Sequence, residues 1–105
     1  MWSIVGVFFG AVFAVNAIPH SVAGVQGRAF PSPFASPPGV GMSPPWVNVL
    51  WGSFNLLVAW ALLCPVAGFD PSRPAHMIAA ALGGVLMALF LARHFGRVMK
   101  DAGRD

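Results

Sequence analysis

The chain has 105 residues, enough for one domain, and it is 57% hydrophobic and only 9% charged, against about 25% charged residues in an average soluble domain. A soluble protein of this size could not bury so much apolar surface, so the composition argues against a soluble globular domain. The net charge of +3 comes without a basic patch interleaved with aromatic residues, and we therefore expect no nucleic-acid partner.

The charged residues leave three long uncharged stretches: before Arg28, between Arg28 and Asp70, and between Arg73 and Arg93. A helix needs about 20 apolar residues to cross a hydrocarbon core about 30 Å thick, and each stretch contains a segment near that length. The sequence therefore predicts an all-α fold, a small transmembrane helical bundle that forms a single domain over residues 1–105. The predicted spans lie at about 2–18, 46–64 and 76–92.

The first span is expected to end or bend at Pro19, which has no N–H to continue the helix. Near this end Asn16 and His20 lie one helical turn apart and share a face. The alternative for this span is a cleaved signal peptide. The uncharged start, Met1 to Ser3, lacks the basic region of such peptides and favours an uncleaved helix.

The segment between the first two spans is rich in proline. It contains "FPSPFASPPGVGMSPP", residues 30–45, without a charge. Proline stiffens the segment, and its phenylalanines are unsuited to bulk water, so we expect it to lie on the membrane surface or to fold back over the helix ends. Either a rigid connector or a lid over a pocket would fit this composition.

The second span is expected to start at Ser43, Pro44 and Pro45, because serine caps free N–H groups and proline fits a first turn. Cys64-Pro65 and Gly68 should stop it, with Cys64 as an apolar filler. Within this span Asn48, Gly52 and Asn55 share one face, at i, i+4 and i+7.

Polar side chains inside the spans need partners, because an unpaired amide in hydrocarbon costs several kcal/mol. We expect Asn16, His20 and Asn48 to form one inward-facing cluster beneath the loop, with Asn55 deeper in the same seam. Two interpretations stay open for these four residues. They either hold the helices together by hydrogen bonds or line a cytosol-facing site for a small polar ligand or ion.

The third span is entered through "FDPSRPAH", and His76 is expected to lie beside this solvated turn, where it should be dispensable. Small residues recur at four-residue spacing on two spans, a pattern that lets helix backbones approach closely. The first and third spans could meet through these faces, or either face could meet another copy of the chain. The predicted helix-packing residues are Gly6, Gly10, Gly52, Ala80, Gly84 and Ala88.

The basic residues predict the orientation. Arg93, Arg97, Lys100 and Arg104 follow the third span, against Asp101 and Asp105. Cytoplasmic loops carry an excess of Lys and Arg. We therefore expect a multi-pass protein of the inner (plasma) membrane with its N-terminus outside, its proline-rich loop inside and its C-terminus in the cytoplasm.

No catalytic constellation is visible, because the carboxylates Asp70, Asp101 and Asp105 all lie outside the predicted spans. We expect no catalytic residues, no metal and no cofactor. Two classes of function remain. The first is a non-enzymatic membrane component that packs with itself as a homo-oligomer or into a larger membrane complex. The second is a binding or transport element that uses the Asn/His pocket.

Three segments, "NAIPH", "GVQGRAFPSPF" and "SPPWVNVLWGSFN", resemble recurring segments of an uncharacterised family of small bacterial multi-pass integral membrane proteins. These segments read N-x-x-P-H, F-P-S/T-P-F and V-N-x-L-W-G-x-x-N, and the resemblance covers about positions 16–55. It implies a membrane bundle and brings no activity, substrate or cofactor. The matching positions are Asn16, Pro19, His20, Phe30, Pro31, Pro33, Phe34, Asn48, Trp51, Gly52 and Asn55.

Overall fold

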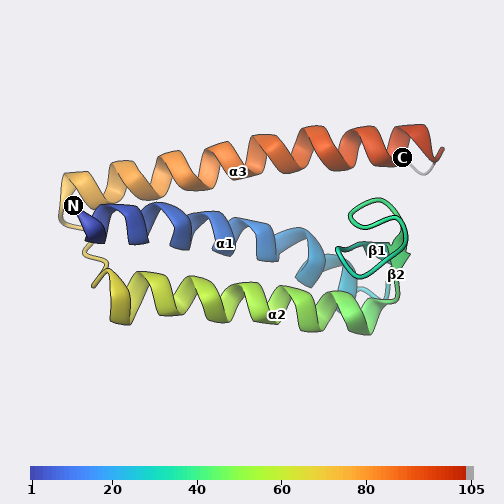
Figure 1. Ribbon diagram of the computed structural model, residues 1–105, viewed down its shortest axis with the longest axis horizontal. Coiled ribbons are helices and arrows are strands. Elements are labelled where there is room, and N and C mark those ends of the chain that lie inside the picture. The colour runs from blue at the N-terminus through green and yellow to red at the C-terminus, as the bar shows by residue number, and fades with distance from the viewer. Residues whose placement is uncertain (104–105) are drawn as a thin grey trace.

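Three helices make up the fold in the computed structural model, which describes residues 1–103 (Figure 1). They are α1 (Trp2–Val25), α2 (Pro45–Ala61), which continues into the π-helical turn η1 (Leu62–Val66), and α3 (Pro74–Asp101). Two short antiparallel strands, β1 (Phe30–Pro31) and β2 (Met42–Ser43), pair in the loop between α1 and α2. The predicted all-α class with three helices is confirmed.

Helix α1 lies between the other two, with α2 along one side and α3 along the other (Figure 1). The proline-rich loop folds back at the end of the bundle opposite the N-terminus (Figure 1); we call this the loop end. At the other end Val7, Ala67 and Ala79 form the buried apolar core. The molecule is 43 Å long and 23 × 21 Å across, long enough to cross a hydrocarbon core of about 30 Å.

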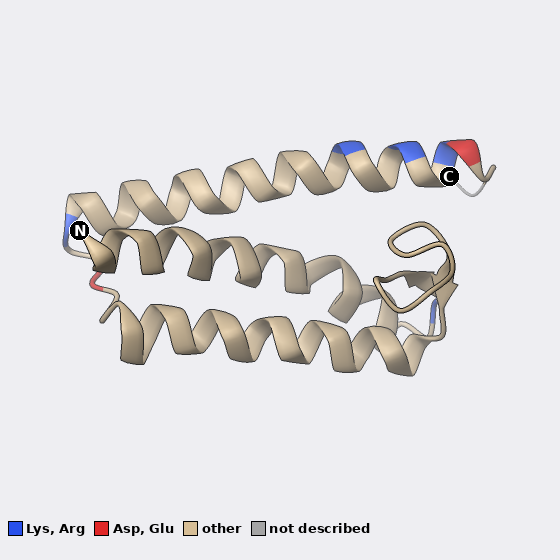
Figure 2. Ribbon diagram, in the orientation of Figure 1, with Lys and Arg blue, Asp and Glu red and all other residues tan. Residues whose placement is uncertain are grey.

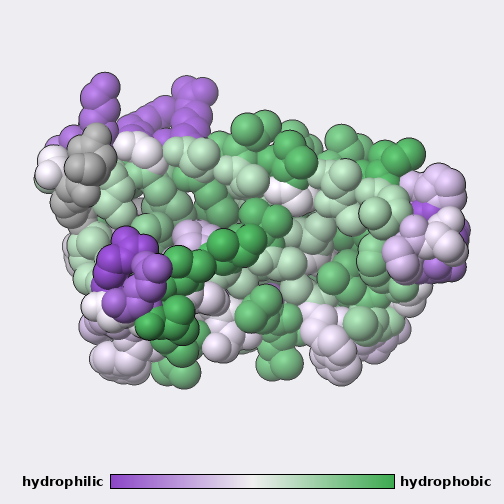
Figure 3. Space-filling model, turned by 180° about the vertical axis from the view of Figure 1, so that it is seen from behind, coloured by the Kyte–Doolittle hydropathy of each residue, from purple (hydrophilic) through white to green (hydrophobic). Residues whose placement is uncertain are grey.

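All three helices are long and apolar enough to cross a membrane, if η1 is counted with α2. Their outer surface is apolar as well: Leu57 and Leu89 are each 63% exposed. On the face shown in Figure 3, hydrophobic residues cover the length of the molecule and hydrophilic residues gather towards its two ends. An apolar belt between polar ends is what contact with a bilayer requires.

The helices differ from the predicted spans at their ends. Helix α1 does not end at Pro19 but continues to Val25, and α3 continues past residue 92 to Asp101. A proline inside a helix removes one backbone hydrogen bond. The turn after Pro19 is stabilised by packing, since His20, Ala23 and Gly24 are all buried.

The start signal of α2 is confirmed in part. Pro45 occupies the first turn, but Pro44 is the N-cap residue and no side chain caps the helix. The expected Ser43 cap is wrong, because Ser43 lies in β2 and its hydroxyl pairs with that of Ser32 at 2.6 Å. At the other end the chain passes through Pro65 within η1 and turns at Gly68, whose φ of +57° favours glycine.

Small residues let the helices approach closely. The glycine face of α1 does not pack on α3, which was one of the predicted pairings. An added Cβ on Gly10 would lie 2.6 Å from Leu63 Cγ, and one on Gly6 would lie 3.0 Å from Ala67 Cβ. This face therefore packs on the end of α2 and η1 rather than on α3. On α3 the closest approach is made by Gly83, where a Cβ would clash with the carbonyl of Phe8.

The other predicted packing residues differ in how close their contacts are. A Cβ on Gly52 would clash with Ser21, so Gly52 lies at a point of close approach between α1 and α2. A Cβ on Gly84 would meet Val15 Cγ2 at 3.4 Å, an ordinary contact. Ala80 packs beside the apolar core, whereas Ala88 is exposed. The small-residue stripe of α3 therefore contacts α1 at its beginning but not at Ala88.

Candidate functional site

Four polar residues lie in the seam between α1 and α2. Asn48 and Asn55 are fully buried, His20 is 3% exposed, and Asn16 is partly buried. The buried face of α2 consists of Asn48, Gly52, Asn55 and Ala59, which is the face that the i, i+4, i+7 spacing predicts. The structure therefore brings all four candidate residues to one seam.

Within the seam the side chains form two hydrogen-bonded pairs. Asn16 Nδ2 donates to Asn55 Oδ1 at 3.0 Å, and His20 Nδ1 lies 2.8 Å from Asn48 Oδ1. Asn55 Nδ2 also donates to the carbonyl of Trp51, one turn back on its own helix, at 2.8 Å. The expected cluster is thus present as two pairs, with Asn16 bound to Asn55 rather than to His20.

Asn48 connects three parts of the chain. Its Nδ2 donates to the carbonyl of Phe30 at 3.0 Å and lies 3.3 and 3.4 Å from the carbonyls of Ser43 and Pro44. With the amide nitrogen directed at these acceptors, the amide oxygen faces His20, so His20 Nδ1 carries the proton and donates. One asparagine therefore links α1, the loop strands and α2.

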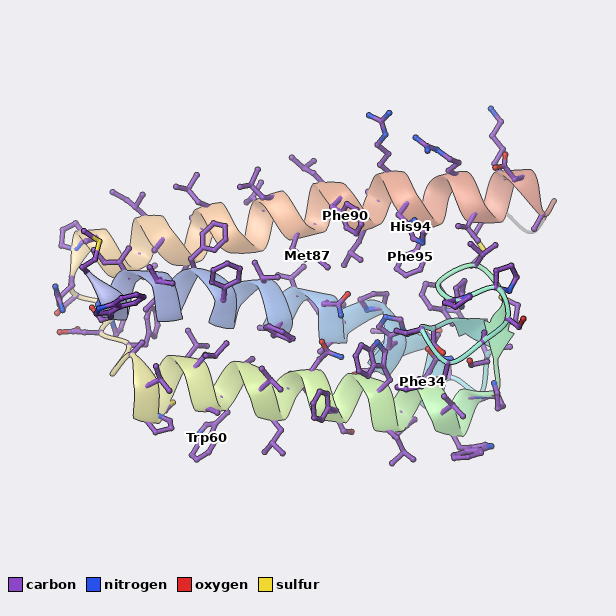
Figure 4. The ribbon with its side chains drawn as sticks, in the orientation of Figure 1. Phe34, Trp60, Met87, Phe90, His94 and Phe95 are labelled. Atoms are coloured by element: carbon purple, nitrogen blue, oxygen red, sulfur yellow. The ribbon has the colours of Figure 1, made fainter. Side chains whose placement is uncertain are left out.

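Aromatic rings surround His20. Its ring makes edge contacts with Phe30, Trp51 and Phe95, at centroid distances of 5.6, 6.3 and 5.9 Å. Phe34 of the loop packs edge-on against Trp51 at 5.3 Å, and the labels in Figure 4 place Phe34 and Phe95 at the loop end of the bundle. The imidazole is therefore enclosed by rings from α2, α3 and the loop.

The loop is also bound to α3. His94 Nε2 lies 2.9 Å from the carbonyl oxygen of Gly39, and since a carbonyl only accepts, the imidazole donates. The buried hydroxyls of Ser32 and Ser43 pair inside the loop. The loop thus folds back over the helix ends as predicted. These two serines and His94 were not among the candidates, because no spacing in the sequence relates them to one another.

The chain has no match among protein-family models, curated proteins or solved structures. The resemblance to small bacterial membrane proteins stays a prediction. The structure adds one relevant fact: the three segments that carry it meet at the loop end, where His20 and Asn48 bind each other and Asn48 binds Phe30.

A second polar cluster lies at the opposite end and corrects an expectation. His76 is fully buried and not beside solvent. Its Nδ1 accepts a hydrogen bond from the backbone N–H of Asp70 at 3.0 Å, and its Nε2 lies 3.2 Å from Ser3 Oγ. The ring is buried because it joins the start of α1 to the turn before α3, and it stacks on Phe69 at 6.1 Å.

The tautomer of His76 decides what this cluster can do. Since Nδ1 accepts, the neutral ring carries its proton on Nε2 and donates it to Ser3. A histidine that activates a serine nucleophile must instead accept the hydroxyl proton. The Ser3–His76 pair is therefore arranged to stabilise the fold.

Outside the helices, hydrogen bonds from the Ser72 hydroxyl and amide lower the pKa of Asp70.

The polar side chains of the four candidate residues have hydrogen-bond partners within the seam. In the described part of the chain every buried side-chain nitrogen or oxygen has a hydrogen-bond partner. Five surface grooves of about 220 to 490 Å³ are present, and none of these five is lined by the four candidate residues. Among residues 1–103, no group of three or more His, Cys, Asp or Glu side chains is placed to hold a metal ion.

Proposed function

We propose that the chain is a non-enzymatic component of a membrane, a small multi-pass protein that packs with copies of itself or into a larger membrane complex. The observation that carries this proposal is the pairing in the α1–α2 seam. Asn16 with Asn55, and His20 with Asn48, use the polar groups that a ligand site would need. Direct hydrogen bonds of this kind commonly hold membrane helices together.

The competing function, binding or transport of a small polar ligand or ion, would need polar groups directed into a cavity. The two pairs are in direct contact at 3.0 and 2.8 Å, which leaves no space for a ligand between the partners. The competing function would therefore require the seam to open, and opening would break the bonds of Asn48 to the loop.

The outer faces of α2 and α3 are the surfaces available to a protein partner. Each of these helices packs mainly against α1, so its far side faces lipid or another protein. Large side chains there are well exposed: Leu50 is 61% exposed, Leu57 63% and Phe90 58%. Without a hydrophobic driving force in lipid, association would depend on close packing of these faces.

The proposal includes the orientation, with the N-terminus outside the plasma membrane and the loop end in the cytoplasm. Charged residues lie at both ends of the bundle (Figure 2). The loop end carries Arg28, Arg93, Arg97 and Lys100 against Asp101, and the other end carries Arg73 against Asp70. Arg104 and Asp105, which the sequence adds to the tail, lie outside the described residues. An excess of basic residues favours the cytoplasmic side.

Cysteine labelling tests the orientation. In a Cys64→Ala background, a cysteine at position 36 should react with an impermeant maleimide only after the cytoplasmic side is opened. A cysteine at position 71 is the matched control and should react in intact cells. The reverse pattern would overturn the proposed orientation.

The mass of the protein purified in mild detergent tests the proposed function. We expect a complex that contains several copies of the chain or a second membrane protein, identified by mass spectrometry. A single copy without a protein partner, carrying a small polar molecule that an Asn16→Leu variant no longer retains, would contradict the proposal and support the binding function.

A further inference from the structure

A groove of about 470 Å³ runs between α1 and α3 near the loop end. The spacing of the two helices widens in this direction (Figure 1). Each wall extends over seven residue steps, 15 to 22 on α1 and 88 to 95 on α3, so the groove follows the helices for about 10 Å. The lining side chains from the helices are apolar: Val15, Ile18, Pro19, Val22, Ala88, Leu91, Ala92 and Phe95.

Small residues of α3 account for the groove. An added Cβ would clash with the backbone of α1 at Gly83 and would lie 3.4 Å from Val15 Cγ2 at Gly84. Further along, Ala88 and Ala92 are exposed, because α1 and α3 have separated and an alanine side chain does not fill the space. The small-residue stripe thus continues beyond the helix–helix contact and leaves a channel on the lipid-facing surface.

Of the described residues, one charged side chain lines this groove. Arg28 lies at its loop end together with Phe30, and its backbone N–H is fixed to the carbonyl of Ala23 at 2.9 Å. Its Nε donates to Gln26 Oε1 at 2.9 Å, which orients the guanidinium and leaves its two terminal nitrogens for another acceptor. Among residues 1–103 no carboxylate lines the groove, so the charge at its mouth is positive.

The geometry points to a binding site for one anionic phospholipid, with an acyl chain in the α1–α3 groove and the phosphate at Arg28. A planar guanidinium fork matches the oxygens of a phosphate and binds them bidentately. Basic residues at the membrane surface attract anionic headgroups, and the apolar walls suit a hydrocarbon chain. The site depends on the membrane location and is independent of whether the chain assembles with itself or with another protein.

Native mass spectrometry of the full chain in detergent tests this site, with phosphatidylglycerol and phosphatidylcholine of identical acyl chains supplied in equal amounts. The unchanged protein should retain one phosphatidylglycerol in preference to phosphatidylcholine. Arg28→Gln should lower retention of phosphatidylglycerol at least about tenfold, because it removes both charge-assisted hydrogen bonds to the phosphate. Arg93→Gln is the matched control. It removes a positive charge from a part of α3 that does not line this groove, so the variant should still prefer phosphatidylglycerol to phosphatidylcholine.

A second variant tests the groove itself. Ala88→Trp fills the channel and should lower retention of both lipids, and Ala92→Leu is the substitute if the tryptophan variant does not fold. Equal retention of the two lipids by the unchanged protein would overturn the site. So would equal losses in Arg28→Gln and Arg93→Gln, or a filled groove that retains lipid as before.

Discussion

Replacing Asn48 by leucine tests the seam most directly, because this side chain bonds to three parts of the chain. Asn48 is fully buried, accepts from His20 and donates to the carbonyl of Phe30. Leucine has the same number and branching of side-chain heavy atoms as asparagine but no polar group. The variant therefore removes the hydrogen bonds while it keeps the shape of the side chain, although its methyl groups are bulkier than the amide.

The expected magnitude follows from the groups left without partners. His20 Nδ1 and the carbonyl of Phe30 would each lose a hydrogen bond in a site with little access to water, at a cost of about 1–3 kcal/mol per group. Measured interhelical hydrogen bonds in membrane proteins average about 0.6 kcal/mol, with a maximum near 1.7. Two groups lose their hydrogen-bond partner, and one of them belongs to a loop that is folded into the bundle. We therefore expect the free energy of unfolding to fall by about 2–3 kcal/mol.

Reversible unfolding of the detergent-solubilised protein measures this loss, and hydrogen exchange of residues 30–43 reports whether the loop detaches. Gln26→Leu is the matched control, since Gln26 is exposed and, within residues 1–103, its side chain hydrogen-bonds to Arg28 alone. We expect the control to change stability by less than about 0.5 kcal/mol. An Asn48→Leu variant that matches this control, with loop exchange unchanged, would refute the role of Asn48.

Three further predictions concern other parts of the bundle. His76→Leu should destabilise the detergent-solubilised protein about as much as His20→Leu, because both rings are buried and hydrogen-bonded; comparing the two unfolding midpoints tests this. Gly83→Leu should lower the midpoint by forcing α3 away from α1, whereas Gly96→Leu, with open space around it, should not. The pKa of Asp70 is lowered by Ser72, so its contribution to stability is complete above the ordinary aspartate pKa and is lost as pH falls through the folded value. Unfolding between pH 6 and 2 should show less acid sensitivity in Asp70→Asn, and equal pH profiles would contradict this linkage.

Much of the architecture was predictable from charge spacing alone. The uncharged stretches located three helices, and the positions of Asn48, Gly52 and Asn55 identified the buried face of α2. These predictions succeeded because they depend on local rules: the length needed to cross a bilayer and the 3.6-residue period of a helix. The prediction that buried amides find partners succeeded for the same kind of reason.

The predictions that failed concern features that depend on contacts between distant parts of the chain. The predicted end of the first helix at Pro19 is wrong, because packing of the following turn carries α1 on to Val25. The sequence predicts that His76 lies beside a solvated turn, yet its partner Ser3 is 73 positions away in sequence. Serine at position 43 suggested a cap, but the strand pairing in the loop directs it to Ser32. No local pattern reveals these partners.

The position of α1 between α2 and α3 explains why the polar residues and the proline-rich loop occur together. At the N-terminal end the turn before α3 closes the bundle around Val7 and Ala79. At the loop end the helices separate, and the loop packs against their ends. A loop that enters an apolar environment must satisfy its backbone carbonyls without water.

The polar side chains of the helices supply the donors that this loop needs. Asn48 donates to the carbonyl of Phe30 and His94 to that of Gly39, while His20 holds the Asn48 amide in the orientation that this requires. Prolines reduce the number of loop N–H groups that need acceptors, and the rings of Phe30 and Phe34 pack on Phe95 and Trp51. The polar pair His20–Asn48 and the apolar, proline-rich loop are therefore parts of one arrangement, in which each makes the burial of the other possible.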